Sequence, residues 1–374
     1  MTTDETPADE PQNGRPRRVF MEYPGWAVYA LLAIASFFAL DAAAEFIVPV
    51  VGAFIVYLLL SPLARAMIRA GTPRILAAAI IVPVTVSALG LGVFALAEPA
   101  AEWFERTPRL GGEIRTRIRT VLSPVEKVKK ATENVEKAAA AATEDSGPKP
   151  REVTVKQPSL TERVLAGIRT FGAGFVVVVI LTFFFLAYGE TFKRRILRSL
   201  QGPRGAAQTE ALIREVERDV SHYLGTIALI NIVLGVLITI GLQVLGFPNA
   251  ALWGAIAAFA NFVPYFGPIV AVGLTAVAGI ISAPSIEFAV AGALLHAGIN
   301  FIEGQFVTPL ILGKRFTISP IVIFVAVAFW GWIWGIAGAL MAVPIVLILR
   351  GLSSRIEGLE TLSVILGNKP RTDG

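Results

Sequence analysis

Cysteine is absent from the sequence, and histidine occurs only twice in 374 residues. Without thiols the chain can form no disulfide, thiolate metal site or thiol nucleophile. The motifs HExxH, GxSxG and GxxxxGK[ST] are also missing, which argues against zinc-peptidase sites, hydrolytic triads and ATP-binding P-loops. The sequence therefore predicts a protein that is not an enzyme and that holds no metal or cofactor.

Charge is also scarce, because Asp, Glu, Lys and Arg make up 16% of the chain and 55% is hydrophobic, with a mean hydropathy of +0.67. Soluble domains usually carry about a quarter charged residues. Apolar runs of about 18 residues or more recur along the chain, and each is long enough to cross about 30 Å of hydrocarbon. The predicted fold class is an all-α membrane protein, a multi-spanning helical bundle.

Changes in composition divide the chain into seven predicted segments. The insert is marked by the charge-laced stretch EKVKKATENVEKAAAAATED, and the amphipathic segment by alternating charge around Glu210 to Arg218. In chain order we expect a disordered cytoplasmic tail (1–24), three transmembrane spans (25–97), an extracytoplasmic helical insert with a linker (98–161), a further span (162–189), a cytoplasmic amphipathic segment (190–224), a transport core with helix hairpins (225–350) and a second cytoplasmic tail (351–374).

Basic residues in short loops predict the orientation. Arg and Lys cluster before the first span, after the second and after the fourth, which puts both termini in the cytoplasm. The parity then requires that the blocks 249–283 and 318–349 each enter and leave on one side, as re-entrant or broken-helix hairpins. A straight helix over the second block would measure about 48 Å, so we expect it to fold back near the GWIWG at 331–335.

One acidic residue lies deep in an apolar segment, at Glu303 in NFIEGQFVTP. At 100° per residue, His296, Asn300 and Glu303 fall on one helical face. An ionised carboxylate at the bilayer centre costs about 3 kcal/mol, so the functional interpretation is a substrate or proton site that also includes Gln305. The alternative is a hydrogen-bonded clamp between packed helices.

The segment ANFVPYFGPIVA at 260–271 is the second candidate. Pro264 and Pro268 have no amide proton, which leaves nearby carbonyls without helical partners. These carbonyls, together with Asn261, could bind a polar solute. The alternative is a tight hairpin apex at which Gly267 and Pro268 turn the chain, and both interpretations can hold together.

Two runs resemble one known family: NFVPYFGPIVA from residue 261, and NFIEGQFVTPLILGKRFTISPIVIFVAVAFWGWIWGIAGALMAVPI from residue 300. They are similar to the C-terminal half of the autoinducer-2 exporter family of bacterial inner-membrane permeases, whose layout this chain follows from about residue 25 to 365. The family's polar motif maps onto Asn261, Pro264, Gly267, Pro268, Glu303, Pro309 and Gly313.

The resemblance implies a multi-pass permease that exports a small polar solute such as the autoinducer-2 signal, by a secondary or facilitated mechanism. It also implies a homo-oligomer, with a pentamer as one candidate. The clustering of Lys and Arg at the ends of apolar runs argues separately against a nucleic-acid partner. Within the same family, a sodium or lithium ion/proton antiporter is the alternative. A membrane scaffold that acts through its extracytoplasmic insert is the alternative from another class. Gly267, Pro309, Gly313, Gly331 and Gly335 are the expected hinge or gating positions.

Overall fold

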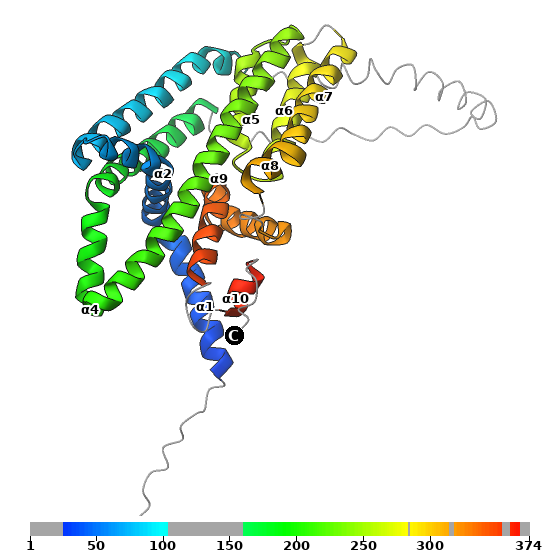
Figure 1. Cartoon of the computed structure of the whole chain (residues 1–374). Helices are drawn as coiled ribbons and strands as arrows, with labels where there is room; N and C mark the ends of the chain where they lie inside the picture. Colours follow the sequence, from blue (N-terminus) through cyan, green and yellow to red (C-terminus); the bar gives the residue numbers. More distant parts are fainter. Residues whose placement is uncertain (1–24, 104–159, 283–284, 314–317, 354–359, 367–374) are drawn as a thin grey trace, which may run out of the picture. The chain divides into compact units, whose positions relative to one another are not determined.

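The computed structural model describes residues 25–103, 160–282, 285–313, 318–353 and 360–366, and every regular element in these ranges is helical (Figure 1). The predicted tail 1–24, most of the insert 98–161 and part of the tail 351–374 lie outside the described residues. Residues 1–43 and 44–374 form two separate compact units.

Asp41 and Glu45 interrupt the first apolar block of the sequence, which predicts two spans joined by a tight acidic turn, and the block divides there. Helix α1 spans Gly25–Ala42 and belongs to the first unit, and helix α2 spans Ala44–Arg69 and opens the second. The break falls at Ala43, between the exposed side chains of Asp41 and Glu45. Each part is a separate apolar helix, as the position of the two carboxylates predicts.

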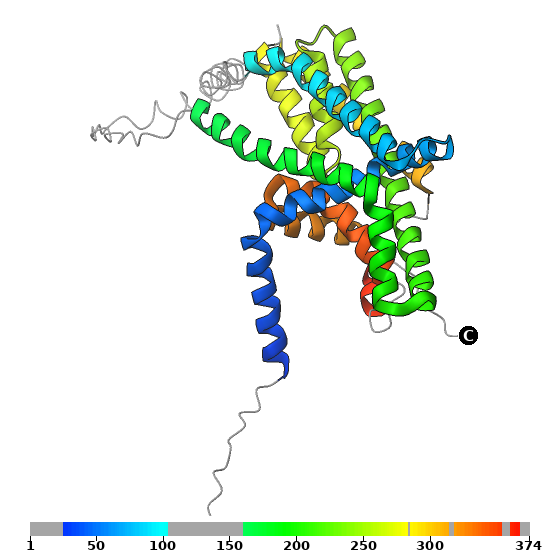
Figure 2. The ribbon, with the colours of Figure 1, turned by 90° about the vertical axis from the view of Figure 1, so that its left-hand side faces the viewer.

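Within the residues that the structure describes, six helical stretches are long and apolar enough to cross a membrane, which confirms the multi-spanning helical class. Helix α4 (Leu160–Val244) supplies two of them, because it is bent, as Figure 1 and Figure 2 show. The six are α2, the helix Arg74–Trp103, the stretches Gly172–Ser199 and Thr209–Val244 of α4, the segment Ile286–Leu312 and α9 (Pro320–Ser353).

Two observed boundaries differ from the predicted layout. The third span continues to Trp103, six residues beyond the predicted end at residue 97, and its helix runs through Pro99. The predicted amphipathic segment 190–224 does not end at residue 224 as a separate element. One helix runs without interruption through Thr209–Val244. Ion pairs across the bend of α4, Lys193 to Glu217 at 3.0 Å and Arg194 to Glu210 at 3.1 Å, pair charges on its two limbs.

The block 249–283 forms a hairpin of two short helices, α5 (Ala250–Ala260) and α6 (Phe266–Ser282). The turn between them places Tyr265 at a φ of 65°, which is rare for a side chain of this size. A Cβ atom at Gly267 would lie 1.8 Å from the Ala260 carbonyl oxygen, so the two helix ends touch through their backbones. Re-entry of this hairpin into the bilayer stays a prediction.

The block 318–349 also reverses direction. Helix α9 is broken at Gly335, whose φ of 60° and ψ of −143° are not helical. A Cβ atom at Gly338 would lie 1.9 Å from the Trp330 carbonyl oxygen, although a straight helix would separate these residues by about 12 Å. The fold-back therefore falls within the GWIWG segment, and its position in a bilayer stays a prediction.

The second apolar stretch of α4 forms the packing surface for the helices of the C-terminal half. It packs against α5, against α7 (Ile286–Ile302) and against α8 (Thr308–Leu312). Helix α6 packs against α7, and α10 (Glu360–Ile365) contacts α9. The buried side chains shared by α4, α5 and α6 include Leu234, Ile238 and Trp253.

We predict that Gly267→Ala lowers the free energy of unfolding by about 1–3 kcal/mol, because the added methyl group must push two helix ends apart. Gly298→Ala is the matched control, since no atom lies within 4 Å of a Cβ at that position. Thermal unfolding of the purified protein, followed by size-exclusion chromatography of the soluble fraction, measures both variants. Equal stability of the two would contradict the close backbone contact.

Candidate functional site

Glu303 begins a π-helical turn, η1 (Glu303–Val307), between α7 and α8. Pro309, at the start of α8, has no N–H for the carbonyl four residues earlier, so a regular helix would lose a hydrogen bond there. The wider turn instead lets the Thr308 N–H donate to the Glu303 carbonyl, five residues back. Such π turns are frequent at functional sites.

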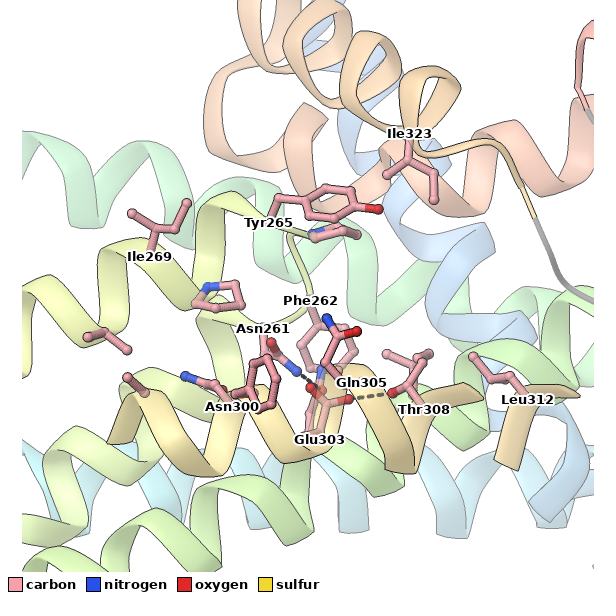
Figure 3. Close-up of a pocket in the computed structure, with 18 of the residues that line it drawn as sticks. Asn261, Phe262, Tyr265, Ile269, Asn300, Glu303, Gln305, Thr308, Leu312 and Ile323 are labelled. Carbon is pink, nitrogen blue, oxygen red and sulfur yellow. Dashed lines mark hydrogen bonds between the residues drawn. The ribbon is translucent and has the colours of Figure 1, made fainter. Parts of the chain in front are cut away.

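A cavity of about 870 Å³, here called the polar cavity, opens between α4, the α5–α6 hairpin and the α7–η1–α8 segment. Figure 3 shows Asn300, Glu303 and Gln305 on one side of it and Tyr265 and Ile269 of the hairpin on the other. Its polar or turn-forming lining residues are Tyr223, Asn231, Asn261, Pro264, Tyr265, Pro268, Asn300, Glu303, Gln305 and Thr308.

An amide pair fixes the hairpin to α4 at the edge of the cavity. The Asn261 side-chain N–H donates to Asn231 Oδ1 at 2.8 Å. Asn261 caps the C-terminus of α5, so its backbone position follows from the hairpin turn, whereas Asn231 is 1% exposed within the apolar face of α4. In a low-dielectric surrounding this bond holds the hairpin in register with α4.

Several buried polar atoms around the cavity have no hydrogen-bond partner. They are both polar amide atoms of Asn300, Oδ1 and Nδ2, and the amide nitrogen of Asn231, Nδ2. Buried polar groups are nearly always hydrogen-bonded, and an exception indicates a water or ligand site. The residues that line the cavity therefore have unused hydrogen-bond donors and acceptors, which suit water or a molecule that carries both kinds of group.

The Glu303 carboxylate faces this cavity, and the described protein groups supply it with few hydrogen bonds and no ion pair. The Thr308 hydroxyl donates a hydrogen bond to Glu303 Oε1, one helical turn away. Among the residues that the structure describes, no Lys, Arg or His forms an ion pair with it. This half-buried carboxylate can therefore accept hydrogen bonds from a polar molecule in the cavity or pair with a cation.

His296 does not belong to this cavity, although the helical projection puts it on one face with Asn300 and Glu303. It is fully buried between α6 and α7, where its Nδ1 lies 2.8 Å from the Thr275 hydroxyl. That hydroxyl donates to the Ala271 carbonyl at 3.0 Å. One face of a helix can line a cavity near one end and pack against a neighbouring helix near the other end. Helical periodicity alone therefore does not show which residues of that face reach the cavity.

The remaining candidate residues divide between cavity and backbone roles. Pro264, Pro268 and Gln305 line the polar cavity. Gly267 lies at the hairpin contact, Pro309 begins α8, and Gly313 ends it with a φ of 62°. Gly335 is the break of α9, Gly331 lies four residues before it, and neither lines the polar cavity. In the described ranges no group of three His, Asp or Glu side chains could hold a metal ion.

Two cavity residues escape the sequence patterns. Asn231 is an isolated amide in the apolar run TIALINIVLGVLIT, and this signal was available in the sequence. Thr308 gives no such signal, because hydroxyl groups are common in membrane helices and commonly bond their own backbone. Only the π turn brings its hydroxyl to Glu303.

Comparison with known proteins decides the family. The AI-2E family transporter profile matches residues 27–357, which is nearly the whole chain. The chain belongs to the AI-2E transporter family. It is thus a multi-pass membrane transporter, and the prediction that it is not an enzyme is confirmed, since its relatives are transport proteins.

Relatives of the AI-2E family match over different lengths. The AI-2 transport protein TqsA of Escherichia coli K12 is 26% identical over 332 residues, 87% of this chain and 90% of TqsA. YhhT of the same strain, named provisionally as a transport protein, is 24% identical over 346 residues, 91% of this chain and 94% of its own. A provisionally named transport protein of Borreliella burgdorferi is 29% identical over 211 residues, 56% of this chain and 58% of its own.

We predict that the polar cavity admits water. The chain has no cysteine, so Asn300→Cys introduces a unique thiol in the cavity, and Leu294→Cys introduces one on the exposed apolar side of the same helix. A membrane-impermeant thiol reagent should modify Asn300→Cys in membranes about tenfold faster or more, because the reactive thiolate forms only where water reaches it. Equal rates would show that the cavity is dry.

We predict that His296 and Thr275 stabilise the packing of α6 on α7 and do not bind solute. His296→Ala and Thr275→Ala should each lower the unfolding temperature, and the double variant should show a coupling energy of about 0.5–1.5 kcal/mol. Unfolding of the four proteins in one detergent measures the cycle. A well-folded His296→Ala protein that has lost solute flux would instead place His296 in the transport path.

Proposed function

We propose that this AI-2E family member is a permease that exports a small polar solute through the polar cavity, with Glu303 as the residue that binds or couples to it. The observation that carries the proposal is the junction of three features at one place: the Pro-broken hairpin, the π turn and the unpaired carboxylate. The AI-2 signal that TqsA transports by name is the first candidate solute for this chain.

The cavity suits a hydroxylated solute of the AI-2 kind. Glu303 and the Asn300 carbonyl oxygen offer acceptors, while the unpartnered Nδ2 groups of Asn300 and Asn231 offer donors. A site built to hydrogen-bond a substrate strongly rejects analogues that lack those groups, because its own buried polar atoms are then left unpaired. This supplies selectivity without ATP, so the mechanism is secondary or facilitated.

Location, direction and assembly complete the proposal. Basic residues in the short loops support a bacterial inner-membrane protein with both termini in the cytoplasm. The two hairpins are proposed to be re-entrant, and the insert 98–161 extracytoplasmic. A homo-oligomer, with a pentamer as one candidate, is the proposed assembly, and membrane lipid, the solute and a proton or sodium ion are its proposed partners.

Glu303→Gln and Glu303→Ala test the function in proteoliposomes loaded with the AI-2 signal. Loss of a hydrogen bond to a charged group costs about 1.5–3 kcal/mol, so both variants should lower the initial flux at least tenfold. Glu287→Gln is the matched control, because this exposed carboxylate on the first turn of α7 lies outside the cavity.

Unchanged flux in both Glu303 variants would remove this residue from the mechanism. A pH change inside the vesicles driven by sodium, and lost in Glu303→Gln, would identify the antiporter alternative instead. Full activity of Glu303→Gln combined with loss of function on deletion of residues 105–155 would favour the scaffold.

A further inference from the structure

A second cavity, here called the apolar groove, lies next to the polar one. Its volume is about 380 Å³, and it runs between the second apolar stretch of α4 and the α7–η1–α8 segment. Aliphatic side chains line it almost completely, among them Leu229, Val233 and Leu237 from α4 and Ile302 and Ile311 from the opposite side. A groove of this composition accepts a hydrocarbon chain.

Glu303 joins the groove to the polar cavity. Among the described residues it is the one side chain that lines both spaces. Lipid-facing helices always present aliphatic surfaces, so the groove alone says little. A groove that ends at a carboxylate without an ion pair among the described residues, with the polar cavity beyond it, is unlike a lipid-covered surface, since hydrocarbon gains nothing from contact with a charge.

We propose that the polar cavity and the apolar groove are two halves of one binding site for a small cationic amphiphile, with its ammonium head at Glu303 and its alkyl chain in the groove. The inference rests on the proposed function only in taking the polar cavity as the transport site. It assigns the site a second substrate class beside the polar solute, because a purely polar solute would leave the groove unused.

Charge complementarity selects the cationic head. The Glu303 carboxylate and the Asn300 Oδ1, which has no hydrogen-bond partner among the described residues, are acceptors one helical turn apart on two residues that line the polar cavity. An ammonium group carries three N–H donors and no acceptor, so it can satisfy both oxygens together. An anionic head would instead meet the carboxylate with no basic side chain of the described cavity lining to offset the repulsion.

A series of n-alkylamines tests the proposal on the full chain in lipid nanodiscs, with isothermal titration calorimetry and empty nanodiscs as the partitioning blank. Affinity should rise about fourfold per added methylene, the gain for burying one CH₂ group, and then level off when the groove is full. Glu303→Gln should weaken amine binding at least tenfold and leave the matched n-alkanols unaffected.

Two substitutions on α4 separate the groove from the lipid surface. Val233 lines the groove and Val236 lines none of the cavities, yet their exposures are nearly equal, 49% and 51%. Val233→Trp should flatten the dependence of affinity on chain length, and Val236→Trp should preserve it. Val233→Ala, which enlarges the groove, should shift the levelling-off to longer chains.

Equal chain-length dependence in Val233→Trp and Val236→Trp would overturn the proposal and leave the groove as a lipid-covered surface. Absence of amine binding above the empty-nanodisc blank would overturn it as well. Neither result touches the proposed function, which fails separately if the Glu303 variants transport the AI-2 signal at the wild-type rate.

Discussion

The structure around the site depends on one constraint, that every backbone N–H and carbonyl inside a bilayer must find a partner within the protein or a wet cavity. Pro309 breaks that rule for a regular helix, and the π turn from Glu303 to Val307 restores most of it. The same adjustment brings the Thr308 hydroxyl to the Glu303 carboxylate. A proline inside a regular helix would bend that helix. Here the π turn that accommodates Pro309 also sets the position of the Glu303 carboxylate.

The two hairpins follow from the same constraint by another route. At Gly267 and at Gly338, helix ends approach so closely that no Cβ atom fits between them, and the carbonyls of Ala260 and Trp330 lie against the neighbouring turn. Close backbone packing of this kind is how membrane helices associate where the hydrophobic effect offers no driving force. It also leaves the α5–α6 turn open toward the polar cavity, where Asn261 reaches Asn231.

The sequence predicts those features that depend on composition over many residues. Apolar length identifies the spans, the acidic pair Asp41 and Glu45 marks the break at Ala43, and excess length predicts the reversal at Gly335. The features that depend on one local geometry were not predictable in this way. A period of 3.6 residues assumes an unbroken α-helix, so it groups His296 with Glu303 and misses both the π turn and the bond from His296 to Thr275.

The polar groups of the cavity lower the stability of the folded protein unless water or a solute in the cavity forms hydrogen bonds with them. Replacing a buried polar set by aliphatic side chains of similar size is commonly neutral or stabilising, so a chain that only had to pack would gain by losing Asn300, Asn231 and Glu303. Asn261 and Asn231 satisfy each other in part, and Thr308 supplies one donor to Glu303, yet both amide atoms of Asn300 remain without a partner. Asn300 and Asn231 line the polar cavity, and on the proposed function a solute or water in this cavity completes their missing hydrogen bonds. On that proposal, the destabilisation of the resting protein and the affinity for its solute have the same physical origin.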